Sequence, residues 1–582
     1  MPVCADQNVN GQRGLAFTRI SCRQPQTVKS NSFEDRTHMS PVIVTRAIST
    51  VGPTLKAGLF ALALGGFALS APHGAAAQVT AFKQAVAEAA SASDPVAQFY
   101  RETGYTAIWT GSDDAARARR AALFRALGEA PMHGLPDRTS EINTLMDVLR
   151  TVQTTRDLGR AEVAMSRALV GYASDLQTGL LQPRQIDDGI VRKKHQPDFA
   201  AYLAGIRDQA PVAYLRSLAP QSAQYQALLR EKMRLESLQR AGGWGPQVAA
   251  KKLESGDSGP AVIALRNRLI AMGYLPRSAA RRYDGALERA VQAFQSDHGL
   301  TADGVAGGGT LAEINKPVSA RLKSVLVAME RERWLTPERG TRHVLVNQTD
   351  FTAKIIDNGE VTFVTRSVIG KDNADRRSPE FSDEMEHMVI NPSWYVPRSI
   401  VTKEYLPKLR NNPNAVGHIE ITDSRGRKVN RATADFSKYT ARTFPFAMRQ
   451  PPSRKNALGL VKFMFPNKYN IYLHDTPQKS LFQREVRAFS HGCIRLAQPF
   501  EFAYALLARQ TENPKDFFHR ILNSGKETKV VLDQKVPVHI IYRTAFVTPK
   551  GQPEYRRDIY GRDAKVWAAL ERAGVVLPGV QG

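Results

Sequence analysis

Cysteine is scarce in this chain, with three among 582 residues. Cys4 and Cys22 both precede an apolar stretch typical of an export signal, so Cys493 alone remains once that signal is removed. A lone thiol in an exported protein has no partner for an intrachain disulfide and is at risk of oxidation. A disulfide framework is therefore excluded, and Cys493 is either an inert core residue or a reactive one.

Long apolar runs are also rare, and the one candidate begins at Lys56. Its basic flank, apolar centre and small residues predict a signal peptide that is cleaved after Ala77. The alternative is an uncleaved membrane anchor. The polar residues before Met39 are unlike the start of a signal, so Met1 and Met39 both remain candidate start residues. We therefore set residues 1–77 apart as an N-terminal extension and signal peptide.

The composition excludes disorder and collagen-like structure, because 42% of the residues are hydrophobic and 23% are charged. A chain of 582 residues exceeds the size of one hydrophobic core, which predicts two to four domains. The net charge of +25 favours polyanionic surroundings. Charge alone does not identify the partner, but export favours an anionic cell wall or outer-membrane surface, and we expect no nucleic acid.

Residues 78–250 predict a helical scaffold domain. Between about Asp94 and Gly243, apolar residues recur at three- and four-residue spacing, most clearly over 161–176 and 225–238. These two periods stop at Gly179 and at Gly242-Gly243, as helices commonly do. No constellation of reactive side chains accompanies them, so the segment is interpreted as a scaffold.

Residues 251–317 predict a compact unit of three helices. Gly256–Pro260 supplies a cap and a helix-start proline for the first helix, which ends at Gly273. The second helix stops at Gly299 and the third begins near Thr310. The sequence from GDSGPAVIALRNRLIAMGYL to the Ala-Val-x-x-Phe-Gln core resembles the three-helix peptidoglycan-binding domain of wall enzymes. A generic helical domain is the alternative, because amphipathic helices with glycine stops are common.

After Arg342 the sequence changes to short β-branched and aromatic runs separated by turn residues. This pattern predicts a mainly-β domain over 340–535, followed by a C-terminal extension over 536–582. The predicted strands are His343–Asn347, Thr352–Asp357, Val361–Ile369, Glu386–Ile390, Leu460–Phe465, Ile471–His474 and Lys529–Leu532.

A stretch of about 394–458 interrupts the predicted strands and contains a helix-like segment at Ser399–Arg410. It is far longer than an ordinary loop, which indicates a folded insertion or a mobile lid. The stretch carries more Lys and Arg than Asp and Glu. These cations either hold an acidic peptide or form a solvated surface, and the sequence leaves both open.

The neighbours of Cys493 favour reactivity. A thiol becomes an effective nucleophile beside an imidazole, and the chain places His491 two residues before it and His474 at the end of a predicted strand. Gly492 permits a tight turn, so that the Gly492 and Cys493 amides face a developing oxyanion, and Tyr472 adds a hydroxyl donor. A zinc site from both histidines and Cys493 is the alternative, but no paired-cysteine spacing supports a metal.

The run IYLHDTPQKSLFQREVRAFSHGCIRL resembles the L,D-transpeptidase signature, in which a histidine is followed after a spacer by Ser/Thr-His-Gly-Cys. The order of segments resembles the large multidomain L,D-transpeptidases of Gram-negative bacteria. The resemblance implies a multidomain α+β protein of the periplasm. Its parts are a helical scaffold, a three-helix peptidoglycan-binding domain and a mainly-β catalytic domain with an inserted lid subdomain.

The resemblance also implies roles for the residues that match the signature. Cys493 is the nucleophile and His474 the general base, with the Asp475 backbone carbonyl orienting the imidazole. His491 and Ser490 then shape the loop or the oxyanion site, which reverses what proximity suggested for His491. No metal or organic cofactor is implied.

Two further residues have less defined roles. Many family members have asparagine two residues after the cysteine, whereas Arg495 stands here, as in the large Gram-negative type. Arg495 either binds a stem carboxylate or braces the loop. Trp394 either lines the pocket or belongs to the core, which is the more common place for an aromatic at a strand end.

The implied reaction is a pair of acyl transfers on peptidoglycan stem peptides. The Cys493 thiolate attacks the carbonyl of the third residue of a tetrapeptide stem, D-alanine leaves, and a diaminopimelate amine takes the acyl group to form a 3→3 cross-link. Alternative acceptors are an amine of an outer-membrane protein, or water in an L,D-carboxypeptidase or endopeptidase. The resemblance also implies acylation of Cys493 by carbapenems. A non-enzymatic wall-binding scaffold is the remaining hypothesis.

Overall fold

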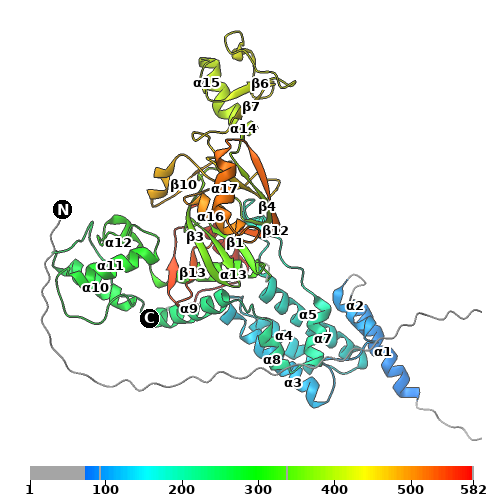
Figure 1. The fold of residues 1–582 in the computed structure, drawn as a ribbon. Helices are drawn as coiled ribbons and strands as arrows, with labels where there is room; N and C mark the ends of the chain where they lie inside the picture. The colour runs from blue at the N-terminus through cyan, green and yellow to red at the C-terminus, as the bar shows by residue number, and fades with distance from the viewer. Residues whose placement is uncertain (1–72, 91–93, 336–337, 580–582) are drawn as a thin grey trace, which may run out of the picture. The chain divides into compact units, whose positions relative to one another are not determined.

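The computed structural model describes residues 73–90, 94–335 and 338–579 (Figure 1). Its first helix, α1 (His73–Ala89), includes the predicted cleavage position Ala77. The rest of the predicted signal peptide, and both candidate start residues, lie outside the described residues. Among the helices that are described, none combines the length and the apolar character needed to cross a membrane.

The N-terminal part is helical, as predicted. Its longest helix, α5 (Thr155–Thr178), starts with a capping box between Thr154 and Asp157 and ends at Gly179, where φ is 84°. The apolar faces of these helices share one core, except for the short helix at 183–186. The other helices are α2 (Pro95–Glu102), α3 (Asp114–Gly128), η1 (Ala130–His133), α4 (Thr139–Arg150), α6 (Pro183–Ile186), α7 (Phe199–Asp208) and α8 (Pro211–Ser217).

A second core forms where α9 (Ala223–Arg240) packs against α13 (Val318–Arg333) and α18 (Arg562–Arg572). The sequence placed α9 in the scaffold domain that ends at residue 250. In the structure, the buried face of α9 contributes to the core of α13 rather than to the core that the earlier helices share. Helical periodicity shows which face is buried but does not identify its partner.

The three-helix unit is present and has its own core. It consists of α10 (Pro260–Ala271), α11 (Gly285–Asp297) and α12 (Gly308–Ile314). Pro260 occupies the start of α10 as predicted, although the capping position is Gly259, which has no side chain to accept a hydrogen bond.

The C-terminal half is built on a nine-stranded sheet with the order β10-β3-β11-β9-β8-β4-β12-β1-β2. Because β2 also pairs with β3, the sheet closes on itself. The strands are β1 (Arg342–Asn347), β2 (Thr352–Asp357), β3 (Glu360–Gly370), β4 (Phe381–Ile390), β8 (Val461–Met464), β9 (Leu473–His474), β10 (Ala488–Ser490), β11 (Ile494–Leu496) and β12 (Thr528–Ile541).

All seven predicted strands are present, but several differ in extent, and β4 begins at Phe381 rather than at Glu386. β9 comprises Leu473 and His474 alone, so Tyr472 precedes it. β12 continues to Ile541, and its last residues pair in parallel with β1. The predicted boundary between the catalytic domain and the C-terminal extension, after residue 535, therefore falls inside a strand and is corrected.

The C-terminal segment contributes to the core of the sheet. Tyr542 and Tyr560 are buried in the same cluster as the strands and as the helices α16 (Pro499–Leu507) and α17 (Pro514–Asn523). Beyond β12 the chain forms a small hairpin of β13 (Ala545–Val547) and β14 (Pro553–Tyr555) and ends with α18. This segment is therefore packed as part of the fold.

The 394–458 stretch is a folded insertion with its own apolar core. A three-stranded sheet in the order β5-β7-β6 carries a helical segment, and these elements gather as one group in Figure 1. The elements are β5 (Trp394–Tyr395), α14 (Arg398–Ile400), the π-helix η2 (Val401–Tyr405), α15 (Leu406–Asn411), β6 (Glu420–Thr422), η3 (Phe436–Lys438) and β7 (Ala447–Gln450).

Candidate active site

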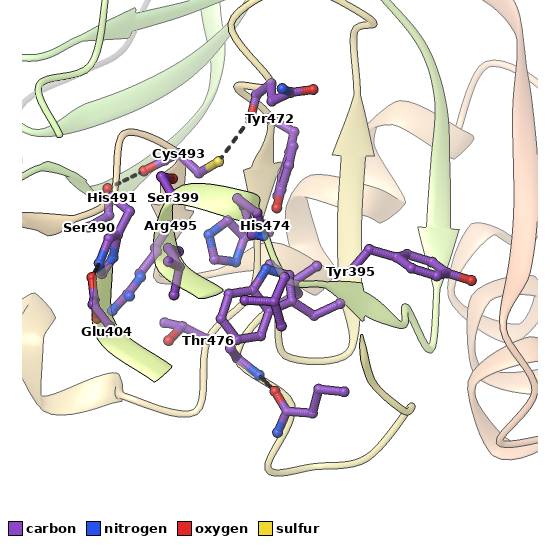
Figure 2. Close-up of a pocket in the computed structure, with 18 of the residues that line it drawn as sticks. Tyr395, Ser399, Glu404, Tyr472, His474, Thr476, Ser490, His491, Cys493 and Arg495 are labelled. Carbon is purple, nitrogen blue, oxygen red and sulfur yellow. Dashed lines mark hydrogen bonds and ion pairs between the residues drawn. The ribbon is translucent and has the colours of Figure 1, made fainter. Parts of the chain in front are cut away.

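A cavity of about 800 Å³ lies between the insertion and the end of the sheet that carries β9 and β11. Residues from the insertion and from the sheet both line it, and Figure 2 shows several of them. Of the predicted site residues, the seven that line it are Trp394, Tyr472, His474, Ser490, His491, Cys493 and Arg495. Gly492 and Asp475 lie behind this wall rather than in it.

Strand pairing brings the two halves of the signature together. β11 pairs in parallel with β9, which sets Arg495 opposite His474. The Ile494 amide also donates to the Tyr472 carbonyl, at 3.1 Å. The 18 residues between His474 and Cys493 therefore form a connection that returns the chain to the side of β9.

His474 is buried and held in one orientation. Its Nδ1 donates to the Asp475 carbonyl at 2.5 Å, the contact that the family resemblance implied, so Nε2 is the ring nitrogen that carries the lone pair. Burial, assisted by the positive charge of Arg495, lowers the pKa of His474 to about 3. The imidazole is therefore neutral near pH 7 and able to act as a base.

The Cys493 thiol is half-buried and donates to the Asn470 carbonyl at 3.4 Å (Figure 2). Burial raises the pKa of Cys493 to about 11, against the opposing effects of hydrogen bonding to Tyr472 and of the Arg495 charge. Burial and the nearby sulfur raise the pKa of Tyr472, so its hydroxyl remains a proton donor. In this state the nucleophile candidate is a thiol rather than a thiolate.

The turn before Cys493 is held by Ser490. The Ser490 hydroxyl donates to the Cys493 carbonyl at 2.6 Å and accepts from the Gly492 amide at 3.1 Å. The predicted use of the Gly492 amide as an oxyanion donor is therefore corrected, because that N–H is already bonded within the turn. Gly492 has φ of +114°, which explains the need for glycine there.

The Cys493 amide remains the backbone candidate for binding an oxyanion. Among the described residues, none offers it a hydrogen-bond acceptor. Backbone amides that are free and rigidly oriented stabilise a developing negative charge effectively.

His491 points to the insertion. Its Nε2 lies 2.6 Å from Oε1 of Glu404, a residue of η2, and Arg376 binds the same oxygen at 2.9 Å. Figure 2 shows His491 and Glu404 side by side at the edge of the site. A local structural role, one of the alternatives for His491, is consistent with this pairing.

Arg495 lies in the cavity wall with one side-chain hydrogen bond, from Nη1 to Gln478 at 2.7 Å. Its buried Nε has no partner, and no carboxylate of the described residues pairs with the guanidinium. Trp394, the second residue of undecided role, lines the cavity from β5, and its ring meets that of Tyr405 edge-on at 6.4 Å. An anionic ligand group would satisfy the unused nitrogens of Arg495.

The described residues contain no group of three or more His, Cys, Asp and Glu side chains arranged to hold a metal ion. The Asp475 carboxylate is instead bonded to the Lys479 ammonium and to the amides of Thr476 and Leu460. It anchors the loop after β9 while its carbonyl binds His474.

Comparison with known families agrees with this arrangement. Residues 341–538 match the family described as "L,D-transpeptidase catalytic domain". Residues 258–314 match "Putative peptidoglycan binding domain", and residues 94–231 match "Scaffold domain". The chain carries an L,D-transpeptidase catalytic domain. The multidomain α+β architecture expected from the sequence, with helical domains before a β-rich catalytic domain, is confirmed.

Individual relatives cover parts of the chain. A "Putative L,D-transpeptidase" of Haemophilus influenzae is 32% identical over 227 residues, which span 38% of this chain and 45% of that protein. This chain therefore matches less than half of that relative's length. Among solved structures, an L,D-transpeptidase of Stackebrandtia nassauensis is 14% identical with a TM-score of 0.20, over 51% of this chain and 97% of that one. One of Xylanimonas cellulosilytica is 15% identical with a TM-score of 0.16, over 51% and 98%.

The L,D-transpeptidase signature did not reveal four neighbours of the site, namely Arg376, Glu404, Asn470 and Ser378. Asn470 has φ of +53°, and an Asn in a turn before a strand was the available signal. Ser378 donates to the Gly492 carbonyl at 2.6 Å. Its position 114 residues before Gly492 gives no sequence signal, because only the strand pairing brings them together.

Proposed function

We propose that this protein is a peptidoglycan L,D-transpeptidase in which Cys493 is the nucleophile and His474 the general base. The observation that carries the proposal is that one cavity holds a neutral thiol, a neutral imidazole whose Nδ1 is the donor, and a guanidinium that no carboxylate of the described residues pairs with. A base with a low pKa takes a proton only as the new bond forms, so we expect attack and proton transfer to occur together.

In the first step, the Cys493 sulfur attacks the carbonyl carbon of the third residue of a tetrapeptide stem. The thiol proton moves to Nε2 of His474, and the charge on the carbonyl oxygen is met by the Cys493 amide and the Tyr472 hydroxyl. The bond to D-alanine then breaks, and His474 returns the proton to the departing amine. A thioester on Cys493 and free D-alanine result.

In the second step, the side-chain amine of a diaminopimelate attacks the thioester. His474 accepts a proton from this amine and delivers it to the departing sulfur, which restores the thiol. The product is a 3→3 cross-link between two stems. Arg495 is the proposed contact for a carboxylate of a stem peptide, because its buried Nε has no partner in the chain.

The insertion favours an amine as acceptor. Its core is folded, and Trp394, Tyr395 and Glu404 line the cavity from that side. A covered site reduces the access of water to the thioester, which disfavours hydrolysis. The acceptor amine belongs to another stem in this proposal, while an outer-membrane protein or water are the competing acceptors.

The site of action in this proposal is the periplasm. The three-helix unit is a match to a peptidoglycan-binding domain, and the net charge of +25 suits an anionic wall. Both features would hold the catalytic domain near its substrate and raise the effective concentration of stem peptides.

The experiment is muropeptide analysis by mass spectrometry in cells that lack L,D-transpeptidase activity. Cells that express the wild type are expected to contain 3→3 dimers, and cells that express Cys493→Ala are expected to contain none. Tripeptides without dimers would identify water as the acceptor, and stems bound to a protein amine would identify the protein acceptor. If both cell lines give the same muropeptides, the proposal fails.

Purified protein supplies a second test of the nucleophile. Incubation with a carbapenem is expected to add one inhibitor mass to the wild type and none to Cys493→Ala. Peptide mapping should place the adduct on Cys493. An adduct on both proteins would contradict the assignment.

A further inference from the structure

The segment that connects β3 to β4 touches the turn before Cys493 from its buried side. Ser378, at the end of this segment, is fully buried, and its hydroxyl donates to the Gly492 carbonyl at 2.6 Å. The same hydroxyl accepts from the Gly370 amide at 3.0 Å. One side chain therefore links β3 to the nucleophile turn.

Two residues of the C-terminal segment hold Ser378 in place. The Tyr560 hydroxyl donates to the Gly370 carbonyl at 2.5 Å and accepts from the Ser378 amide at 3.3 Å. The Arg562 guanidinium donates to the Ser378 carbonyl at 3.0 Å. The amide and carbonyl groups of both Gly370 and Ser378 are thus bonded by just three side chains. Burial raises the pKa of Tyr560 to about 12, so its hydroxyl keeps its proton near pH 7.

Arg562 is itself rigidly placed. Its side chain is 1% exposed, and its nitrogens lie 3.4 Å from Glu380 and 3.6 Å from Asp187. The guanidinium stacks over Tyr560 at 5.0 Å from the ring centre. A buried cation that is paired in this way has one favourable position, because displacement would separate it from both carboxylates without access to water.

The space around two glycines shows how closely β3, the segment between β3 and β4, and the nucleophile turn pack together. A Cβ atom on Gly370 would lie 2.0 Å from the Arg376 carbonyl oxygen. A Cβ on Gly492 would lie 3.1 Å from Ile471 and 3.7 Å from the same Arg376 oxygen. The connecting segment is therefore clamped between β3 and the nucleophile turn, so a shift of Ser378 would move the turn.

The Gly492 carbonyl fixes the direction of the next amide. In a planar trans peptide, the C=O of one residue and the N–H of the next point in opposite directions. Since Ser378 holds the Gly492 carbonyl on the buried side, the Cys493 N–H is directed away from Ser378. That amide is the backbone donor available for an oxyanion once the Gly492 amide is bonded to Ser490.

We propose that Ser378, Tyr560 and Arg562 are positioning residues for acyl transfer, which orient the Cys493 amide toward the oxyanion of the tetrahedral intermediate. The C-terminal segment is then part of the catalytic apparatus, although none of its residues touches the substrate. This inference rests on the proposed function. It adds that the rate of the acyl step depends on hydroxyl groups behind the nucleophile turn.

Two reactions of Cys493 separate this role from a general structural one. Alkylation by iodoacetamide requires only the Cys493 sulfur, because it forms no oxyanion. Acyl transfer from a tetrapeptide stem requires the sulfur and also a donor that stabilises the oxyanion. Ser378→Ala and Tyr560→Phe remove one hydroxyl each and keep the remaining side chain. We expect kcat for acyl transfer to fall by about 10-fold to 100-fold in both variants, with KM and the alkylation rate unchanged.

Tyr555→Phe is the matched control. The Tyr555 hydroxyl is also buried in the C-terminal segment, but it donates to Glu231 and has no contact with the nucleophile turn. This variant should keep the wild-type kcat. Equal kcat values for all four proteins would overturn the inference alone, as would alkylation and acyl transfer that fall in parallel. A wild type that is alkylated but transfers no acyl group would overturn the proposed function and the inference with it.

Discussion

The nucleophile turn is held from two sides by different kinds of contact. On the cavity side, Glu404 of the insertion pairs with His491 and Arg376, and these three side chains are each about a third exposed. On the opposite side, Ser378, Tyr560 and Arg562 form hydrogen bonds among groups that are almost fully buried. Both sides include charged groups, but those on the cavity side reach solvent, whereas those on the opposite side are buried.

This difference indicates which contact can be broken at low cost. Exposed ion pairs contribute little to stability because water and salt compete for the same groups. Buried hydrogen bonds and paired charges leave unsatisfied partners when one member is lost. The contacts on the insertion side are therefore the less costly to break, while those on the C-terminal side keep the turn fixed.

The largest expected effect comes from removing the buried cation of the fixed side. Arg562→Met should lower the free energy of unfolding by about 3 kcal/mol, because Glu380 and Asp187 would each lose one of their two cationic partners in a buried place, and the Ser378 carbonyl would lose its donor. Chemical denaturation followed by circular dichroism measures this loss. Lys565→Met is the control, since Lys565 binds Asp187 from a half-exposed position, and should cost about 1 kcal/mol or less. Similar losses in both variants would show that the buried Arg562 contributes no more to stability than the half-exposed Lys565.

A second prediction separates the core of the insertion from that of the sheet. Phe436 is buried in the insertion, and Phe436→Ala should lower the free energy of unfolding of the insertion by about 3–5 kcal/mol, because it removes a packed ring. Hydrogen exchange is expected to increase over 394–458 while the strands stay protected. Phe518→Ala, which truncates a buried ring in the core of the sheet, should instead increase exchange in the strands. Faster exchange throughout the sheet in Phe436→Ala would show that the two cores unfold together.

A third prediction concerns the positive charge of Arg495, which belongs to neither of these two sets of contacts but affects the pKa of Cys493. Burial raises the pKa of the thiol, so the rate of alkylation by iodoacetamide should still rise with pH above pH 9. Arg495→Gln removes a cation that favours the thiolate. The midpoint of the profile should move to higher pH, and the rate at pH 8 should fall several-fold.

Lys455→Gln is the control for that profile. Lys455 also lines the cavity but is not among the groups that shift the pKa of Cys493. Its variant should reproduce the wild-type midpoint. An Arg495→Gln profile that also matches the wild type would show that Arg495 does not influence the thiol.

Much of the fold followed from local sequence patterns. The stop of α5 at Gly179, the proline start of α10 and the existence of all seven predicted strands depend on neighbours along the chain. The partner of α9 and the true extent of β12 did not follow, because they depend on α13 and β1. Periodicity identifies a buried face, but long-range packing determines which surface covers it.

The candidate site shows the same division. The spacing of His474 and Cys493 carried a family signature, and the Asp475 carbonyl bond to His474 matches the expected geometry. Glu404 and Ser378 had no signature, since their contacts with the nucleophile turn cross 87 and 114 residues of sequence. We expected the Gly492 amide to bind the oxyanion. The structure shows that this amide donates to the Ser490 hydroxyl instead, a contact between residues two positions apart.

The smallest expected effect is on the exposed side of the turn. Glu404→Gln keeps the shape of the side chain but removes the charge that pairs with His491 and Arg376. We expect a loss of about 1 kcal/mol or less in the free energy of unfolding, because the groups are partly solvated. The difference from wild type should shrink further in 1 M salt, which screens the pair.

Lys403→Gln is the matched control for Glu404→Gln. Lys403 neighbours Glu404 in η2 and pairs with Asp375, so it joins the insertion to the same connecting segment without contacting His491. Both variants should be similarly stable, but only Glu404→Gln should alter the exchange of the His491 amide region. A loss of stability in Glu404→Gln that equals that of Arg562→Met would mean that the insertion side is fixed as firmly as the C-terminal side.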